Sequence, residues 1–82
     1  MKKILLDARD LEHPIPLQLA LNHLQKMDLD EFLYMIHRKN PIPLIEIAKE
    51  KNYAYLSHNH KDIWHILICK NINSNLEELL DV

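Results

Sequence analysis

A chain of 82 residues in which 48% are apolar and 27% charged has the composition of one ordinary globular domain. The net charge of −2 gives no basic excess of the kind typical of nucleic-acid-binding proteins. The single cysteine excludes an internal disulfide. The lack of glycine excludes the glycine-rich loops that bind phosphates in other proteins. The apolar run after the first lysines stops at Asp7, which is too short for a signal peptide or a membrane span, so we expect a cytoplasmic protein.

The first half of the chain has the pattern of a strand, a helix and a second strand. Residues 2–7 form a short apolar run that predicts a buried strand. Pro14 and Pro16 then mark the start of a helix that we expect to end near Lys26, because proline is tolerated in a first turn whose N–H groups lack intrahelical partners. Residues 31–39 are rich in β-forming side chains and predict a second strand.

The second half repeats this order and adds a hairpin. A second helix is predicted to begin at Pro41, and strands over residues 53–57 and 63–70 are predicted to pair through the turn between them. Ser74 stands three residues ahead of Glu77, which is the spacing of a capping box, and predicts a short C-terminal helix. Because the chain lacks glycine, turns with positive φ are expected at its asparagines, namely Asn52, Asn59, Asn71 and Asn73.

The resulting element order is β-α-β-α-β-β, followed by the short helix. Because a β-α-β crossover within one sheet is right-handed, both long helices fall on the same face of a four-stranded mixed sheet. We therefore predict an α+β fold built as a two-layer α/β sandwich with one open sheet face. Residues 1–72 are expected to form this domain, and residues 73–82 a C-terminal helical tail.

The pattern Pro-Ile-Pro-Leu occurs twice, at residues 14–17 and 41–44. In both copies the prolines stiffen the connection from strand to helix and fix the direction of the helix N-terminus. We interpret the second copy as structural. The first copy differs because a histidine precedes it.

The segment LLDARDLEHPIPLQLALNHLQKM, residues 5–27, resembles the TusA/SirA-like proteins, small sulfur carriers with the same element order. In that family a CPxP motif places a persulfide-carrying cysteine at the start of the first helix. Here His13 occupies the position of that cysteine, while Pro14 and Pro16 match the two prolines. Because imidazole does not form a persulfide, the resemblance implies the fold and the place of a site, but not the carrier reaction. It points to an uncharacterised related group with HPxP in place of CPxP.

The binding site predicted from this motif consists of His13, Pro14, Pro16, Arg9 and Asp10. Free N–H groups and the helix dipole favour an anion at the start of a helix, and the Arg9 guanidinium could hold an oxyanion. The alternative is that His13 only caps the helix and that Arg9 pairs with Asp7 or Asp10 on the surface.

Six histidines in 82 residues is a high number. His58 and His60 are two residues apart, a spacing that could supply two metal ligands, but we place both in the hairpin turn, and no cysteine or carboxylate completes a recognisable set. They are therefore weak metal candidates. We expect His23 on a helix surface, His37 at a strand end and His65 on the less buried face of its strand.

Cys69 ends the apolar run of the last predicted strand. A buried structural thiol is the simpler interpretation, because the residue belongs to no CxxC motif and does not occupy the family's nucleophile position. The rival hypothesis is a sulfur-transfer or redox enzyme in which Cys69 has taken over the thiol role.

Four aromatic side chains are available to line the open sheet face, namely Tyr34, Tyr53, Tyr55 and Trp64. An exposed aromatic patch usually marks a partner surface, and it would suit a homodimer or a regulatory interaction module. The C-terminal leucines could cover that face instead.

Our leading expectation from the sequence is a small, non-catalytic binding or adaptor domain. Its ligand would be a small anion, a metal or cofactor of unknown identity, or a protein partner. A connection with sulfur or redox metabolism is implied by the resemblance alone. Neither nucleic acid nor a membrane is expected as a partner.

Overall fold

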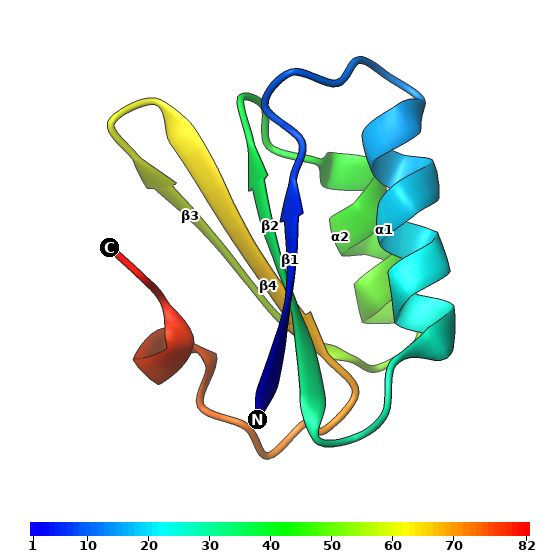
Figure 1. Ribbon diagram of the computed structural model, residues 1–82. Helices are drawn as coiled ribbons and strands as arrows, with labels where there is room; N and C mark the ends of the chain where they lie inside the picture. Colours follow the sequence, from blue (N-terminus) through cyan, green and yellow to red (C-terminus); the bar gives the residue numbers. More distant parts are fainter.

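The computed structural model describes residues 1–82 and confirms the predicted α+β fold (Figure 1). The elements are β1 (Lys2–Asp7), α1 (Ile15–Lys26), β2 (Glu31–His37), α2 (Ile42–Glu50), β3 (Ala54–His60), β4 (Ile63–Cys69) and the 3₁₀ helix η1 (Leu76–Leu79). None of its helices is both long and apolar enough to cross a membrane.

The four strands form one mixed sheet in the order β1-β2-β4-β3. Strand β1 pairs with β2 in parallel, and β4 pairs with both β2 and β3 in antiparallel fashion. Helices α1 and α2 lie together on one face of the sheet, as Figure 1 shows. Because β1 and β2 are parallel neighbours, their carboxyl ends lie side by side, and both strand-to-helix connections begin there. The site described below lies between these two connections.

The larger part of the hydrophobic core lies between the helices and the sheet. Alternate residues of β2 and β4 face the helices, so Leu33 and Met35 pack with Ile66 and Ile68. Ala20 and Leu24 of α1 and Leu44 and Ala48 of α2 close this layer from the other side, and all of these residues are buried.

A second, smaller core lies on the opposite face of the sheet. Phe32 and Tyr34 of β2 and Leu67 and Cys69 of β4 are buried there beneath Leu76 of η1, with Leu79 and Leu80 packed alongside. The C-terminal segment thus covers part of the face that a two-layer sandwich would leave open. The predicted C-terminal helix is only a single 3₁₀ turn, and the capping box does not form, because Asn75 occupies the N-cap position without a side-chain hydrogen bond.

The hairpin between β3 and β4 is tighter than predicted. Strand β3 extends to His60, and the turn consists of Lys61 and Asp62, with φ angles of 51° and 66°. Pairs of residues with positive φ form the turns whose twist matches that of the flanking strands. Of the asparagines expected at positive φ, only Asn52 adopts it, at 58°. Asn59 and both neighbouring histidines belong to the strand.

The four aromatic side chains do not gather on one sheet face. Tyr53 and Trp64 pack against the core on the helix side, and Tyr55 faces the same side as its strand partner Ile68. Only Tyr34 lies on the opposite face, where it is 1% exposed. The expected aromatic patch is therefore wrong, because strand alternation places Tyr53, Tyr55 and Trp64 on the helix side and only Tyr34 beneath the C-terminal segment.

Candidate functional site

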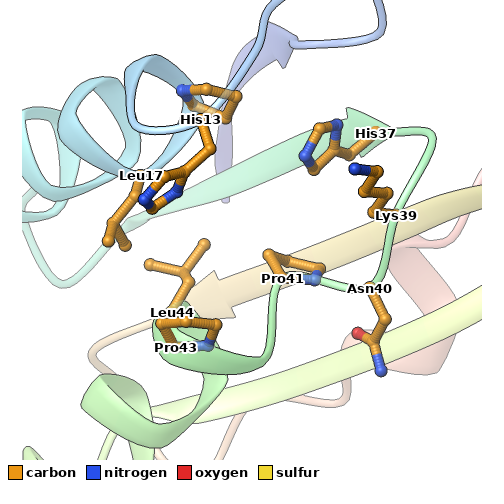
Figure 2. Close-up of a pocket in the computed structure, with 9 residues that line it drawn as sticks. His13, Leu17, His37, Lys39, Asn40, Pro41, Pro43 and Leu44 are labelled. Carbon is orange, nitrogen blue, oxygen red and sulfur yellow. The ribbon is translucent and has the colours of Figure 1, made fainter.

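A cavity of about 150 Å³ lies where the two strand-to-helix connections meet. Figure 2 shows His13 and Leu17 on the α1 side, His37 and Lys39 near the end of β2, and Pro41, Pro43 and Leu44 on the α2 side. Pro16 and Asn40 complete the lining. Residues 20 or more positions apart in the sequence thus share one cavity, because the parallel pairing of β1 with β2 brings the two junctions together.

Both copies of the Pro-Ile-Pro-Leu repeat contribute equivalent residues to this cavity. Pro16 and Leu17 from the first copy face Pro43 and Leu44 from the second. The residue at each N-cap position is the first proline of its repeat, Pro14 or Pro41, and neither helix has a side-chain cap. The second repeat, which we had interpreted as structural, is therefore also part of the candidate site.

The repeat controls which backbone N–H groups are free at the start of α1. The N–H groups of Ile15 and Gln18 donate to backbone carbonyls at 2.9 and 3.1 Å. Pro16 has no N–H to donate. The N–H of Leu17 is consequently the one donor of this first turn that lacks a backbone acceptor.

Helix α2 repeats the same arrangement. The N–H groups of Ile42 and Ile45 donate to backbone carbonyls at 2.9 and 3.1 Å, and Pro43 has none, which leaves the N–H of Leu44 free. Leu17 and Leu44 both line the cavity. The first turns of both helices therefore line one small space, and each of these turns has a single N–H without a backbone acceptor.

His37 contributes the most constrained polar group of the site. Its Nδ1 is buried and has no hydrogen-bond partner within the chain. Burial lowers the pKa of the His37 imidazole, and the nearby charges of Arg38 and Lys39 lower it further, while the nearby backbone of Ala8 opposes them. The ring is therefore neutral near pH 7, and a residue that lines the cavity has a buried nitrogen without a partner.

The sequence had indicated only that His37 ends a strand. Its position at the carboxyl end of a parallel strand, three residues ahead of Asn40 and the second repeat, was the available signal. What no pattern shows is the missing hydrogen bond of Nδ1, because that depends on how Ala8 and the two connections pack around the ring.

A second hollow adjoins the cavity and shares three of its residues, His13, His37 and Lys39. Its volume is about 390 Å³, and its remaining lining is Leu11, Glu12 and Arg38. The positive charges of Arg38 and Lys39 exceed the single negative charge of Glu12, so this second hollow has a net positive charge. His13 is exposed, and its peptide bond to Pro14 is cis.

Three of the five residues proposed from the motif, namely Arg9, Asp10 and Pro14, do not line either hollow. The Arg9 guanidinium forms a forked pair with Asp7, with Nε and Nη2 at 2.9 and 2.6 Å from the two carboxylate oxygens. Hydrogen bonds from the Arg9 side chain and backbone lower the pKa of Asp7 to about 2. Neither Arg9 nor Asp10 lines the two hollows, so the surface pairing that the sequence offered as an alternative is the one formed.

Other groups capable of chemistry also lie outside the cavity. Cys69 is fully buried, and its Sγ donates to the carbonyl of Asn71 at 3.3 Å, as expected for a structural thiol. The ligand oxygens of Asp28, Asp30 and Glu31 lie within 4.8 Å of one another at the start of β2, but the Glu31 carboxylate already accepts the N–H of Asp28. A reactive thiol requires access to solvent, so Cys69 gives no support to a thiol enzyme.

Comparison with protein families gives one match. The model of a family described as "Uncharacterized conserved protein (DUF2249)" matches residues 5–70. This range includes both repeats and the whole lining of the cavity, and it ends before η1. No significant match was found among curated proteins, and none among solved structures.

Proposed function

The chain belongs to the DUF2249 family, and we propose that it is a small, non-catalytic binding domain whose ligand presents a compact anionic group to the cavity between the two repeats. The observation that carries this proposal is the convergence of two helix N-termini, each with one free N–H, on a cavity lined by Lys39 and two histidines.

Each part of the cavity favours negative charge for a separate reason. The N-terminal end of a helix carries a partial positive charge, and its unused N–H groups are directional donors for an oxyanion. Lys39 adds a full positive charge, and the imidazole of His37 adds another when it is protonated next to a bound anion. A volume of about 150 Å³ accommodates a group the size of phosphate, sulfate or a carboxylate.

The resemblance to TusA/SirA-like proteins supports the place of this site and narrows its chemistry. His13 stands where those carriers have their persulfide cysteine, so a covalent sulfur intermediate is not part of the proposal. Reversible binding of an anion, free or on the side chain of a protein partner, uses the same donors. The proposed link to sulfur or redox metabolism depends on the resemblance.

We would test the site by NMR titration of the ¹⁵N-labelled protein with phosphate, sulfate and thiosulfate, each against sodium chloride at equal ionic strength. The amides of Leu17 and Leu44 and the rings of His13 and His37 are expected to shift together with one dissociation constant. Binding is expected to be tighter at pH 6 than at pH 8, because a bound anion favours protonated His37.

Two substitutions separate the cavity from general surface charge. Lys39→Gln and His13→Ala are expected to weaken binding at least about fivefold, on the scale of one charge-assisted hydrogen bond. Lys51→Gln, which removes a lysine from the other end of α2, is the matched control and should leave affinity within twofold. Equal affinity of the Lys39 and Lys51 variants, or no shift at Leu17 and Leu44 with any of the three anions, would refute the proposal.

A further inference from the structure

Three histidines lie together on the sheet face opposite the helices, away from the cavity. His58 and His60 are two apart on β3 and therefore point to the same side, and His65 of β4 is the direct cross-strand partner of His58. The same alternation places Leu56 and Leu67 on this side, where both belong to the core under η1. The three histidines thus share one surface.

The ring of His60 lies next to the rings of both other histidines, although the three are not yet at the spacing of metal ligands. The ring centroids of His58 and His60 are 6.4 Å apart, and those of His60 and His65 are also 6.4 Å apart. Three imidazoles around one tetrahedral zinc ion, with Zn–N bonds of about 2.0–2.1 Å, have centroids about 5 Å apart. Binding therefore requires the His58 and His60 side chains to rotate toward His65, and both have room to turn because His60 is exposed and His58 is half-buried.

The third ring is already held in place by an outer hydrogen bond. His65 is 9% exposed, and its Nδ1 lies 2.8 Å from the hydroxyl oxygen of Tyr34. Its Nε2 has no hydrogen bond within the chain and keeps some contact with solvent. When a metal ion is bound to Nε2, the proton of the ring is on Nδ1, and the Nδ1–H group donates a hydrogen bond to the hydroxyl oxygen of Tyr34. Contacts of this kind orient metal-ligating histidines.

We propose that His58, His60 and His65 bind one divalent transition-metal ion, with Zn²⁺ as the reference ion and a water molecule as the fourth ligand. Imidazole suits zinc, copper and nickel, and three histidines with an open position are an established zinc ligand set. The sequence showed only the first two of these residues. The antiparallel register of β3 with β4 supplies the third.

The test is a calorimetric titration of tag-free protein with Zn²⁺, repeated with Ni²⁺, alongside NMR of the histidine ring nitrogens. One ion per chain is expected to bind with a dissociation constant of about 10 µM or tighter. The Nε2 resonance of His65 should change most, and its Nδ1 should become the protonated nitrogen. Both His58→Gln and His60→Gln are expected to weaken binding at least about tenfold.

Two matched variants control for other histidines. His23→Gln on α1 and His13→Gln at the cavity should each leave zinc affinity within twofold. The substituted positions 58 and 60 are not buried, so their variants are expected to fold, and an amide spectrum with unchanged core signals checks this. The proposal is overturned if zinc binds more weakly than about 1 mM, if either β3 variant retains wild-type affinity, or if His13→Gln alone abolishes binding. None of these results bears on anion binding in the cavity, which is measured separately.

Discussion

The hydroxyl of Tyr34 connects the second core, the histidine surface and the C-terminal segment. Its oxygen lies 2.8 Å from Nδ1 of His65 and accepts the backbone N–H of Asp81 at 3.0 Å. Tyr34→Phe removes both hydrogen bonds and keeps the aromatic ring in its buried place. The ammonium of Lys3, which lies 4.5 Å from the ring centroid, still has an aromatic face to contact.

The size of the effect follows from what is left without a partner. A buried polar group that loses its only hydrogen bond costs about 1–3 kcal/mol, and His65 is buried. Asp81 is exposed, so water replaces the lost acceptor there and adds little. We therefore expect the free energy of unfolding to fall by about 1–3 kcal/mol, which corresponds to roughly 4–8 °C in Tm for each kcal/mol.

Urea denaturation followed by circular dichroism measures this change, and amide hydrogen exchange at residues 76–82 shows whether the C-terminal segment loosens. Tyr55→Phe is the matched control, since the Tyr55 side chain is partly exposed and its hydroxyl has no hydrogen bond within the chain. That variant should stay within about 0.5 kcal/mol of the parent. If Tyr34→Phe also stays within that range, the hydroxyl does not hold this network together and the argument fails.

Two further predictions concern pH and the hairpin. Burial and the charges of Arg38 and Lys39 lower the pKa of His37 in the folded state, so the unfolded chain binds more protons than the folded chain as the pH falls through 6.5. The free energy of unfolding should therefore fall as the pH drops from 7.5 to 5.5. The fall should be smaller in the His37→Gln variant. Parallel slopes for parent and variant in urea titrations across this range would contradict that reasoning. Lys61 and Asp62 both have positive φ, which Asn and Gly adopt more readily. Replacing the pair by Asn-Gly should therefore raise the free energy of unfolding by about 0.5–1 kcal/mol. A thermal unfolding curve that moves to lower temperature would show instead that the native side chains stabilise the turn.

Most of the fold could be predicted from the sequence because its signals are local and agree with one another. The run of β-forming side chains within residues 31–37, the proline pairs and the helical spacing after them each indicate their element independently of the others. The right-handed crossover rule then places both helices on one face of the sheet, but it does not determine the strand order β1-β2-β4-β3.

The errors occur where tertiary contacts override a local preference. Asn59 is a good turn residue by itself, but it lies opposite Trp64 in the sheet, and the chain turns instead at Lys61 and Asp62. Likewise, Ser74 and Glu77 have capping spacing, but the leucines around them pack flat on the sheet and permit a single 3₁₀ turn. Pairing and burial outweigh intrinsic propensity at these positions.

For the cavity, the sequence indicated the first junction and missed the second. His13 and Pro16 lie where the motif suggested, but His37 and Lys39 enter only through the parallel pairing of β1 with β2. The sequence Pro-Ile-Pro-Leu follows each of the two strands of a parallel pair. Because the carboxyl ends of such strands lie together, the repeat could have predicted a cavity between the two junctions. Arg9 does not line the cavity, and its guanidinium is instead paired with the carboxylate of Asp7, which is only two residues away in the sequence.

The C-terminal segment also has a consequence for the order in which contacts form and open. Its ion pair between Asp81 and Lys3 joins positions 78 residues apart, which makes the loop that it closes the longest in the chain. Long loops carry the largest closure entropy, so the sheet and both helices can assemble before this segment docks. By the same argument the segment detaches first, in a local opening that leaves the helix-side core intact and briefly exposes Phe32 and Leu67 to solvent.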